Sequence, residues 1–445
     1  MKKIIFNFIL FLNFIPLYAN NITVLSLKQC EDSALKKSPI IKALQYNVQS
    51  AQQNLKSKNQ SLYPTLTLNA MGNYTAVLPY LSIMGFNETF GDYWGYSVGP
   101  TLDYILFDNR ARNNSYKSIQ NLCESKLQDL EYEKKNIIMS VRLQYFQIQA
   151  ALEKIYILDK RLKLAQKQYK DISINYKSGA KSELDLIMAN KQVLTAKNQI
   201  ELARKNLSKY LRELFELTQD DFNVDPSYPI DYRLNEKQYT NNSSCILKID
   251  DVNDSLNQFL VYEKYIFDES SPQLVSLEKI AQYYFNVSKS YKSQKYPFIK
   301  LQSGGYYQYP NGPVKEQILQ GTANLLLSMP IFESSNKTAL TKANQLTSKA
   351  TEEQKKGLIT TLKKDFYNAK DRLYIIDIQQ NINTEIVEES QKISDLIYIS
   401  YKLGQVTFLE VQTANLGLSQ SRIELIDLKI EKLVNLAIIA GLGKE

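Results

Sequence analysis

The sequence has 445 residues, with 54 Lys+Arg, 46 Asp+Glu, 31 tyrosines and no histidine. Because histidine is the commonest general base and metal ligand, its absence excludes Ser-His-Asp and Cys-His nucleophilic sites and the HExxH zinc motif. The mean hydropathy is −0.33, and no run of ~18 apolar residues follows the N-terminal segment, which excludes a polytopic helical membrane protein. We therefore expect a protein that is not an enzyme and that uses no metal or other cofactor.

Residues 1–19 have the pattern of an export signal. A pair of lysines is followed by an apolar run from Ile4 to Tyr18 and by the small residue Ala19, as signal cleavage requires. An uncleaved anchor helix is the alternative, but polar residues and a proline interrupt this short run. Cleavage lowers the net charge from +8 to +6, a mild excess that does not indicate a nucleic-acid partner.

The three cysteines have a spacing that matches no metal motif. In an oxidising compartment they permit one disulfide with one thiol left over, and the alternative is that all are unpaired. They are Cys30, Cys123 and Cys245.

Two long stretches of the chain are typical of helical hairpins. Residues 101–225 contain no proline and a single glycine, Gly179, and residues 331–445 contain no proline and have Gly404 near their middle. Apolar residues recur in steps of three and four along both stretches, which is the spacing of helices that supercoil against neighbours. A helix from residue 109 to 175 would be ~100 Å long and would need partners alongside it.

The two predicted hairpins are copies of each other. The segment Tyr176-Lys177-Ser178-Gly179 matches Tyr401-Lys402-Leu403-Gly404 at an offset of 225 residues. The same offset relates further pairs: Phe107 and Phe332, Ser182 and Thr407, Leu184 and Leu409, Asp185 and Glu410, and Ala189-Asn190 and Ala414-Asn415. Upstream, the offset is 233, which relates Ser38-Pro39 to Ser271-Pro272 and Tyr63-Pro64 to Tyr296-Pro297. A duplicated unit with eight extra residues in its first copy is the simplest explanation.

Each copy contains two segments in which apolar and polar residues alternate. They span residues 64–78 and 93–107 in the first copy and residues 297–309 and 318–332 in the second. Such alternation is typical of membrane β-barrel strands, although a half-buried sheet in a soluble domain has the same pattern. The export signal favours the barrel. Because small closed barrels need about eight strands or more, other subunits must complete these four.

Aromatic residues gather around the loop between the first two predicted strands. This concentration resembles the aromatic girdle that barrels place at the membrane interface. The predicted girdle residues are Tyr80, Phe86, Phe90, Tyr93 and Trp94.

The segment 217–270 differs from its surroundings. It contains two prolines and an Asn-Asn-Ser-Ser cluster, and its 11 acidic residues outnumber its four basic ones. We expect either a mixed α/β belt around the helices or a linker, without a ligand-binding site.

The order of these features resembles the TolC-like outer-membrane efflux protein family. The matching residues are an opening helix at Leu27 to Pro39, Tyr63-Pro64, Leu106-Phe107-Asp108, Tyr176 to Gly179, Leu184-Asp185-Leu186, and the second-copy equivalents through Ala414-Asn415. Each motif is weak, but their order, spacing and duplication together are specific. The resemblance implies a mainly α-helical fold with a membrane β-barrel: a homotrimer with a 12-stranded β-barrel joined to a 12-helix α-barrel, located in the cell outer membrane and extending into the periplasm.

This interpretation divides the chain into five parts. They are a signal peptide (1–19), a first repeat (20–216, with a helical hairpin at 108–216 and its tip at 176–181), an acidic equatorial connector (217–270), a second repeat (271–440, with a hairpin at 333–440 and its tip at 401–406) and a tail (441–445).

The resemblance also assigns roles to the tips. It implies that they contact a periplasmic adaptor through Tyr176, Lys177, Ser178, Gly179, Tyr401, Lys402, Leu403 and Gly404. It places the periplasmic entrance constriction at Glu410, Asp185 and Tyr401. Well-studied members carry a second acidic residue where this chain has Thr413 and an arginine where it has Val406, so Glu410 is the acidic residue left at that position.

Both a functional and a purely structural role remain open for these residues. Three copies of a carboxylate around an axis form a negative ring that favours cations. Asp185 and Glu410 equally suit the first turn of a helix, where the helix dipole favours acidic residues. Tyr176 and Tyr401 equally suit packing beside a tight turn.

The sequence therefore predicts the outer-membrane exit duct of a tripartite efflux or type I secretion system. The duct would conduct substrate passively from an inner-membrane transporter and a periplasmic adaptor to the exterior, and its helical tips would gate it. The expected partners are two further copies of the chain, the adaptor, the transporter and outer-membrane lipid. The alternative is a soluble periplasmic coiled-coil adaptor or structural protein. Drugs, metal ions and protein all remain possible cargo.

Overall fold

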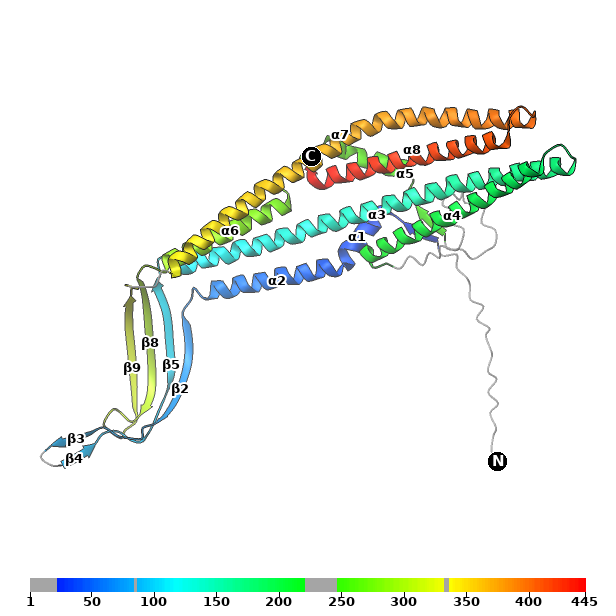
Figure 1. The fold of residues 1–445 in the computed structure, drawn as a ribbon. Helices are drawn as coiled ribbons and strands as arrows, with labels where there is room; N and C mark the ends of the chain where they lie inside the picture. Colours follow the sequence, from blue (N-terminus) through cyan, green and yellow to red (C-terminus); the bar gives the residue numbers. More distant parts are fainter. Residues whose placement is uncertain (1–21, 84–85, 221–245, 332–335) are drawn as a thin grey trace, which may run out of the picture. The chain divides into compact units, whose positions relative to one another are not determined.

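A computed structural model describes residues 22–83, 86–220, 246–331 and 336–445 (Figure 1). The predicted signal peptide, Cys245, Phe332 and the middle of the connector lie outside these residues. The elements are β1 (Ile22–Leu25), α1 (Leu27–Lys37), α2 (Pro39–Gln60), β2 (Thr65–Tyr74), β3 (Tyr80–Ile83), β4 (Phe86–Thr89), β5 (Trp94–Phe107), α3 (Ala111–Lys177), α4 (Glu183–Thr218), β6 (Ile246–Ile249), α5 (Val252–Phe259), a 3₁₀ helix (Leu260–Lys264), β7 (Ile266–Phe267), α6 (Pro272–Ser293), β8 (Phe298–Tyr309), β9 (Ile318–Ser328), α7 (Asn336–Lys402), α8 (Phe408–Leu442) and β10 (Gly443–Lys444).

The chain packs as two compact units, and each unit takes residues from both sequence repeats. The first unit comprises the residues up to 38 together with 135–267 and 365–445, and the second comprises 39–134 and 268–364. The helices α3 and α7 contribute residues to both units, and each has 67 residues. Neither contains a proline, and Gly357 in α7 is the only glycine in either helix, so nothing in their sequences interrupts them.

The second unit contains a four-stranded antiparallel sheet in the order β2-β5-β8-β9 (Figure 1). The pairing of β5 with β8 joins the strand hairpin of the first repeat to that of the second. The strands at the two edges of this sheet are β2 and β9. Part of the longer first-repeat loop forms a separate short hairpin, β3–β4.

The strand register gathers most of the apolar residues of the four strands on one face of the sheet. Leu66 is opposite Leu102 between β2 and β5, and Val98 is opposite Tyr307 between β5 and β8. Because side chains alternate along a strand, residues two positions from these pairs share their face. Further apolar residues placed on this face by the register are Leu68, Ala70, Tyr104, Leu301, Leu319, Leu325 and Leu327.

Polar residues occupy the opposite face of the sheet. Asn69 donates a hydrogen bond from Nδ2 to Thr101 Oγ1 at 2.7 Å. Asp103 Oδ1 lies 2.6 Å from Lys300 Nζ and also accepts from Gln302 Nε2 at 2.9 Å. The sheet therefore has one apolar and one polar face.

In the second unit, side chains attach the start of α3 to its surroundings. Asp108 caps this helix, because its Oδ2 accepts from the backbone N–H of Arg112 at 3.0 Å and from its Nε at 2.8 Å. Ser290 of α6 donates from Oγ to the carbonyl of Ala111 at 2.8 Å. These contacts secure the transition from β5 to α3.

In the first unit, the middle of α3 anchors the connector and the beginning of the described chain. Tyr145 is fully buried, and its hydroxyl lies 2.8 Å from Asp250 Oδ2 and 3.0 Å from the carbonyl of Leu25. Gln149 donates to the carbonyl of Asp250 at 2.7 Å. The strands next to these residues, β1 and β6, pair in parallel. Burial, with the neighbouring Asp250, raises the pKa of Tyr145 far above its usual range.

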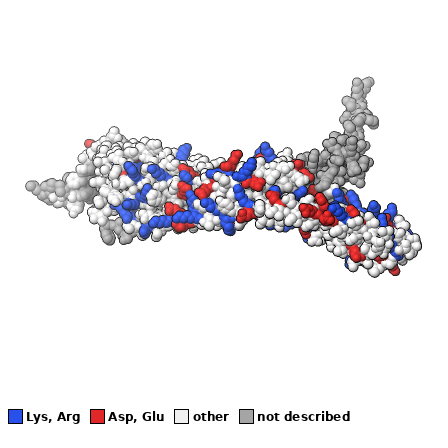
Figure 2. Space-filling view, turned by 90° about the horizontal axis from the view of Figure 1, so that it is seen from above, with Lys and Arg blue, Asp and Glu red and all other residues white. Residues whose placement is uncertain are grey.

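The helices carry charged residues along their length. Figure 2 shows Lys and Arg side chains interleaved with Asp and Glu over the helical part of the molecule. Among residues 22–83, 86–220, 246–331 and 336–445, we find no helix whose length and apolar character would let it cross a membrane.

Candidate functional site

The two turns at the ends of the helical hairpins have the same backbone geometry. Gly179 and Gly404 have φ angles of +78° and +77°, in the left-handed region that a side chain disfavours. After the first glycine, Ala180 N–H donates to the carbonyl of Asn175 at 2.8 Å, and the matching bond of the second turn is 3.0 Å long. Both long helices therefore end in a Schellman motif, which explains the Tyr-x-x-Gly repeat.

Side chains cap the helices that follow both turns. Ser182 Oγ accepts from the backbone N–H of Asp185 at 3.1 Å, and Thr407 Oγ1 accepts from that of Glu410 at 3.4 Å. Glu410 Oε2 accepts in return from the backbone N–H of Thr407 at 2.6 Å, which completes a capping box. Hydrogen bonds from the backbone and the hydroxyl of Thr407 lower the pKa of Glu410. Both predicted constriction carboxylates thus lie in the first turn of a helix, and Glu410 is exposed.

Near the turns, the hairpin α3–α4 packs against the hairpin α7–α8, and we call this contact the tip seam. Residues from all four helices, or from their ends, form its buried apolar core, and less buried apolar side chains surround it. The core residues are Ile172, Ala189, Tyr401, Phe408 and Val411. The seam therefore joins the two sequence repeats within one chain.

Two polar contacts cross the tip seam. Lys181 donates from Nζ to the carbonyl of Tyr401 at 3.0 Å, and the same Nζ lies 3.8 Å from the centroid of the Tyr401 ring. A cation on a ring face is stabilising by about 0.5–2 kcal/mol, depending on its exposure. Tyr398 donates from its hydroxyl to Asp171 Oδ2 at 2.8 Å. These contacts link the α3–α4 hairpin to α7.

Further along the seam, a buried amide connects three helices. Asn415 of α8 accepts from Ser394 Oγ of α7 at 2.8 Å through Oδ1. It donates from Nδ2 to Gln168 Oε1 of α3 at 3.1 Å. All three residues are buried, so these polar atoms satisfy one another where water has little access.

The two equivalent tyrosines of the turns have different environments. Tyr401 is 3% exposed and packs on Phe408 with ring centroids 5.3 Å apart, whereas Tyr176 is 40% exposed. Burial and the nearby Asp185 carboxylate raise the pKa of Tyr401 to about 12. The structure thus places Tyr401 inside the tip seam. The other predicted adaptor-contacting residues with side chains are exposed: Lys177, Ser178, Lys402 and Leu403.

Three polar residues of the tip seam are not marked by any motif in the sequence. Lys181, Asp171 and Tyr398 lie within six residues of the turns, but they belong to no shared motif of the two repeats. At the offset of 225 the other copy has a different residue type at each of these positions, but so it does at many neighbouring positions, and sequence offers no signal that singles them out.

The sheet carries a row of aromatic side chains on its apolar face. The ring centroids of Tyr74 and Trp94 are 4.9 Å apart, and those of Tyr96 and Tyr309 are 5.8 Å apart. Trp94 is the predicted girdle residue in this row, and Tyr93 packs on Tyr74 at 6.4 Å. The remaining predicted girdle residues lie elsewhere: Tyr80 begins β3, Phe86 begins β4 and Phe90 follows β4.

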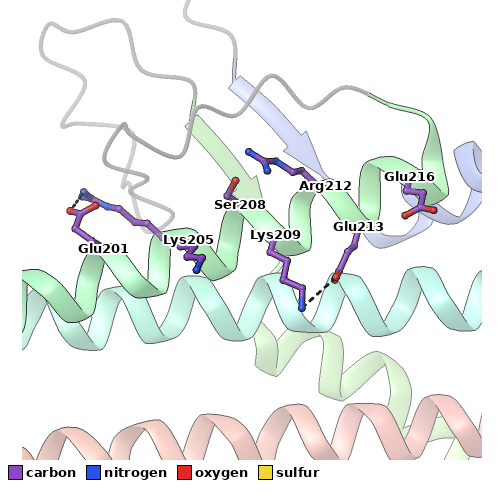
Figure 3. A pocket seen from close by; sticks show the side chains of 8 residues that line it. Glu201, Lys205, Ser208, Lys209, Arg212, Glu213 and Glu216 are labelled. Carbon is purple, nitrogen blue, oxygen red and sulfur yellow. Dashed lines mark hydrogen bonds and ion pairs between the residues drawn. The ribbon is translucent and has the colours of Figure 1, made fainter.

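An open groove lined by charged residues lies beside α4 in the first unit (Figure 3). Its lining residues all come from α4, and four of them form two ion pairs: Arg204 lies 2.7 Å from Glu201, and Lys209 lies 3.6 Å from Glu213. These paired charges do not converge on a ligand. The parts of the chain that the structure describes also contain no group of three His, Cys, Asp or Glu side chains that could hold a metal ion.

Comparison with known proteins adds independent evidence on family and fold. Residues 31–218 match the model of the family described as outer membrane efflux protein. No curated protein matches the sequence. The fold is similar to that of CusC, with a TM-score of 0.75 and 16% identity, covering 94% of this chain and 92% of that one. It is also similar to the Vibrio cholerae outer membrane protein VceC (TM-score 0.74, 14% identity, 94% and 95% covered) and to the Campylobacter jejuni CmeC outer membrane channel (0.71, 16%, 94% and 85%).

These matches confirm the predicted fold class, a mainly helical chain with β-hairpins. By sequence over residues 31–218 and by fold over 94% of its length, the chain is similar to outer membrane efflux proteins.

Proposed function

We propose that this protein is the outer-membrane exit duct of a tripartite efflux or type I secretion system and that it works as a homotrimer. The observation that carries the proposal is the sheet of the second unit, which has one apolar face and two open edges. Leu66 on β2 and Leu325 on β9 belong to that apolar face, and they are 71% and 68% exposed. Such a face requires lipid, and open edges cannot lie in lipid unpaired.

Closure by further copies satisfies both requirements. If β2 of one copy pairs with β9 of the next, three copies of the four-stranded sheet form a barrel of twelve strands, within the size range of closed membrane barrels. The apolar face then contacts outer-membrane lipid, and the polar face with Asp103 and Lys300 lines the channel. The aromatic row around Trp94 supports a position at a membrane interface.

We further propose that the helical tips form the periplasmic entrance and contact a periplasmic adaptor, which links the duct to an inner-membrane transporter. Three exposed Glu410 side chains, one from each copy, would form a negative ring at this entrance, with Asp185 close to it in the first turn of α4. Tyr401 would support the entrance from inside the tip seam, because its packing on Phe408 would hold the second turn in place. The exposed residues of both turns would form the adaptor contact.

The direct test is to express the full chain in a Gram-negative host, separate the membranes and purify the protein in detergent. We expect it in the outer-membrane fraction, as a trimer by native mass spectrometry, with discrete channel conductance in planar bilayers. Recovery as a soluble periplasmic monomer would contradict the proposal and would favour the alternative of a coiled-coil adaptor or structural protein.

A further inference from the structure

Basic residues gather where the helices of the second unit meet the sheet. The last ten residues of α2 and α6 and the first ten of α3 and α7 contain eight Lys or Arg and no Asp or Glu. Figure 1 shows these four helix ends beside the ends of the four strands. We call the eight residues the basic collar: Lys56, Lys58, Arg112, Lys117, Lys289, Lys292, Lys337 and Lys342.

The charges around the basic collar do not neutralise it. The nearest charged residues of the strands, Asp103 and Lys300, pair with each other. The four segments that connect these helices to the strands add two acidic and two basic residues: Asp108, Glu333, Arg110 and Lys295. The collar and its connections therefore contain ten basic and two acidic residues, a net charge of +8.

The other ends of α3 and α7 provide an internal comparison. The last ten residues of α3 and α7, the first ten of α4 and α8 and the two turns between them contain five basic and five acidic residues. The net charge of the tips is thus zero. The excess of positive charge is specific to the helix ends beside the sheet and is not a general property of the helices.

Three of the collar residues line a cavity in the second unit. Its volume is about 350 Å³, and Lys58, Arg112 and Lys337 surround it together with Asp108 and three serines. Because Asp108 is the one acidic side chain among the described residues that line the cavity, their net charge is +2. Arg112 uses three of its five N–H donors within the chain, on Asp108 and on two backbone carbonyls, which leaves two donors for a ligand.

The basic collar lies next to the apolar face of the sheet. Cζ of Arg112 is 6.0 Å from the ring centroid of Tyr104, which belongs to that face. The edge strands β2 and β9 have 10 and 11 residues, the length of a strand that crosses the hydrocarbon layer of a membrane. Six of the eight collar residues lie within five residues of a helix end, or ~7 Å, and the headgroup layer is about as thick.

We propose that the basic collar binds the phosphate groups of anionic phospholipid in the membrane leaflet next to the helices and that the cavity receives one of these phosphates. This inference rests on the proposed function, because it requires the sheet to lie in a membrane. Ammonium and guanidinium groups attract phosphate oxygens by charge and by hydrogen bonds. A zwitterionic lipid carries an ammonium of its own, which the collar repels. The collar therefore selects lipids with a net negative charge.

The test measures which lipid the full-length protein retains. The detergent-purified protein is mixed with equal amounts of phosphatidylglycerol and phosphatidylcholine with the same acyl chains, and native mass spectrometry gives the ratio of the two bound lipids. We expect phosphatidylglycerol to be favoured by about fivefold, the effect of roughly one unit charge at ~4 Å in water. The preference should fall as the ammonium acetate concentration rises, since salt screens the charges.

Two variants that lose the same charge locate the preference. The collar variant combines Lys58→Gln, Lys292→Gln and Lys342→Gln, which remove one charge from each of three helix ends beside the sheet. We expect its preference for phosphatidylglycerol to fall below about twofold. The control variant has the same change at three exposed lysines of the α3–α4 hairpin and should keep the wild-type ratio: Lys170→Gln, Lys191→Gln and Lys197→Gln. Circular dichroism of both variants verifies that the helices are intact.

The outcomes separate this inference from the proposed function. A ratio near one in the wild type, or an equal fall in both variants, would overturn the inference even in a protein that forms conducting trimers. If the ratio were near one and 10 mM inorganic phosphate raised the melting temperature of the wild type but not of the collar variant, relative to sodium chloride of equal ionic strength, the occupant would be a soluble anion instead. A preference lost only in the collar variant would support the inference even if no conductance were found, because the collar lies within a single chain.

Discussion

Glu410 has two roles that substitution can separate. One of its oxygens completes the capping box of α8, and its exposed charge is available to the proposed entrance ring. Because the hydrogen bonds of the cap lower its pKa in the folded protein, its contribution to stability is present at neutral pH. That contribution is lost as the pH falls below its ordinary value of 4.5.

We expect Glu410→Gln to retain the cap, since glutamine also serves in capping boxes, and to reduce the cation preference of the channel. Glu410→Ala should reduce the cation preference equally and should also lower the thermal stability. The measurements are reversal potentials across a salt gradient and thermal melting at pH 7. An unchanged reversal potential in both variants would show that Glu410 caps α8 but does not set the ion preference of the channel.

At the scale of elements, the glycines of the two turns terminate the long helices. The left-handed backbone at Gly179 and Gly404 satisfies the last carbonyls of α3 and α7, and an added Cβ at either glycine would meet no atom within 4 Å. Any effect of alanine at these positions is therefore a backbone effect and not a clash.

Gly404→Ala should destabilise the second turn by roughly 1–2 kcal/mol, the strain of a left-handed alanine. Hydrogen exchange measured by mass spectrometry on peptides from residues 395–410 should become about tenfold faster. Gly417→Ala is the matched control, because Gly417 lies inside α8 with open space around it and alanine favours a helix by about 1 kcal/mol. Equal exchange rates in wild type and Gly404→Ala would show that the turn does not need glycine.

The whole molecule leaves an apolar stripe of α7 exposed. Its members are spaced by three, four or seven residues, as in a helix that packs lengthwise on another. They are Ile375, Ile378, Ile382, Ile386, Ile393 and Leu396. A stripe of this length on the surface of a single chain is consistent with burial against a second copy in the proposed trimer.

Leu396→Glu should weaken each seam between copies by roughly 3 kcal/mol or more, because it would bury a charge without a partner. We expect native mass spectrometry to show monomers in place of trimers. Leu396→Met, which retains volume and apolar character, should leave the trimer intact. Stable Leu396→Glu trimers would indicate that the stripe faces solvent in the assembly.

Several features of this protein follow from its sequence alone. The long helices, their glycine turns and the alternating strands depend on residues that are neighbours within two to five positions, so periodicity and backbone preference suffice to predict them. The constant offsets of 225 and 233 residues between equivalent positions also reveal the duplication. Local sequence does not decide whether the carboxylates at the turns cap a helix or form an entrance ring, and the capping bonds of Glu410 are visible only in the folded chain.

Only the tertiary structure decided how the two repeats differ at the tips. Tyr176 and Tyr401 stand in equivalent local sequences, yet Tyr176 is half-exposed and Tyr401 is buried, because only Tyr401 lies in the core of the tip seam. Lys181 meets Tyr401 across 220 residues of chain. Such a contact depends on which helix faces come together, and local patterns carry no record of that choice. The sequence thus determined the repeated parts of the protein, and the packing of one repeat on the other made equivalent residues different.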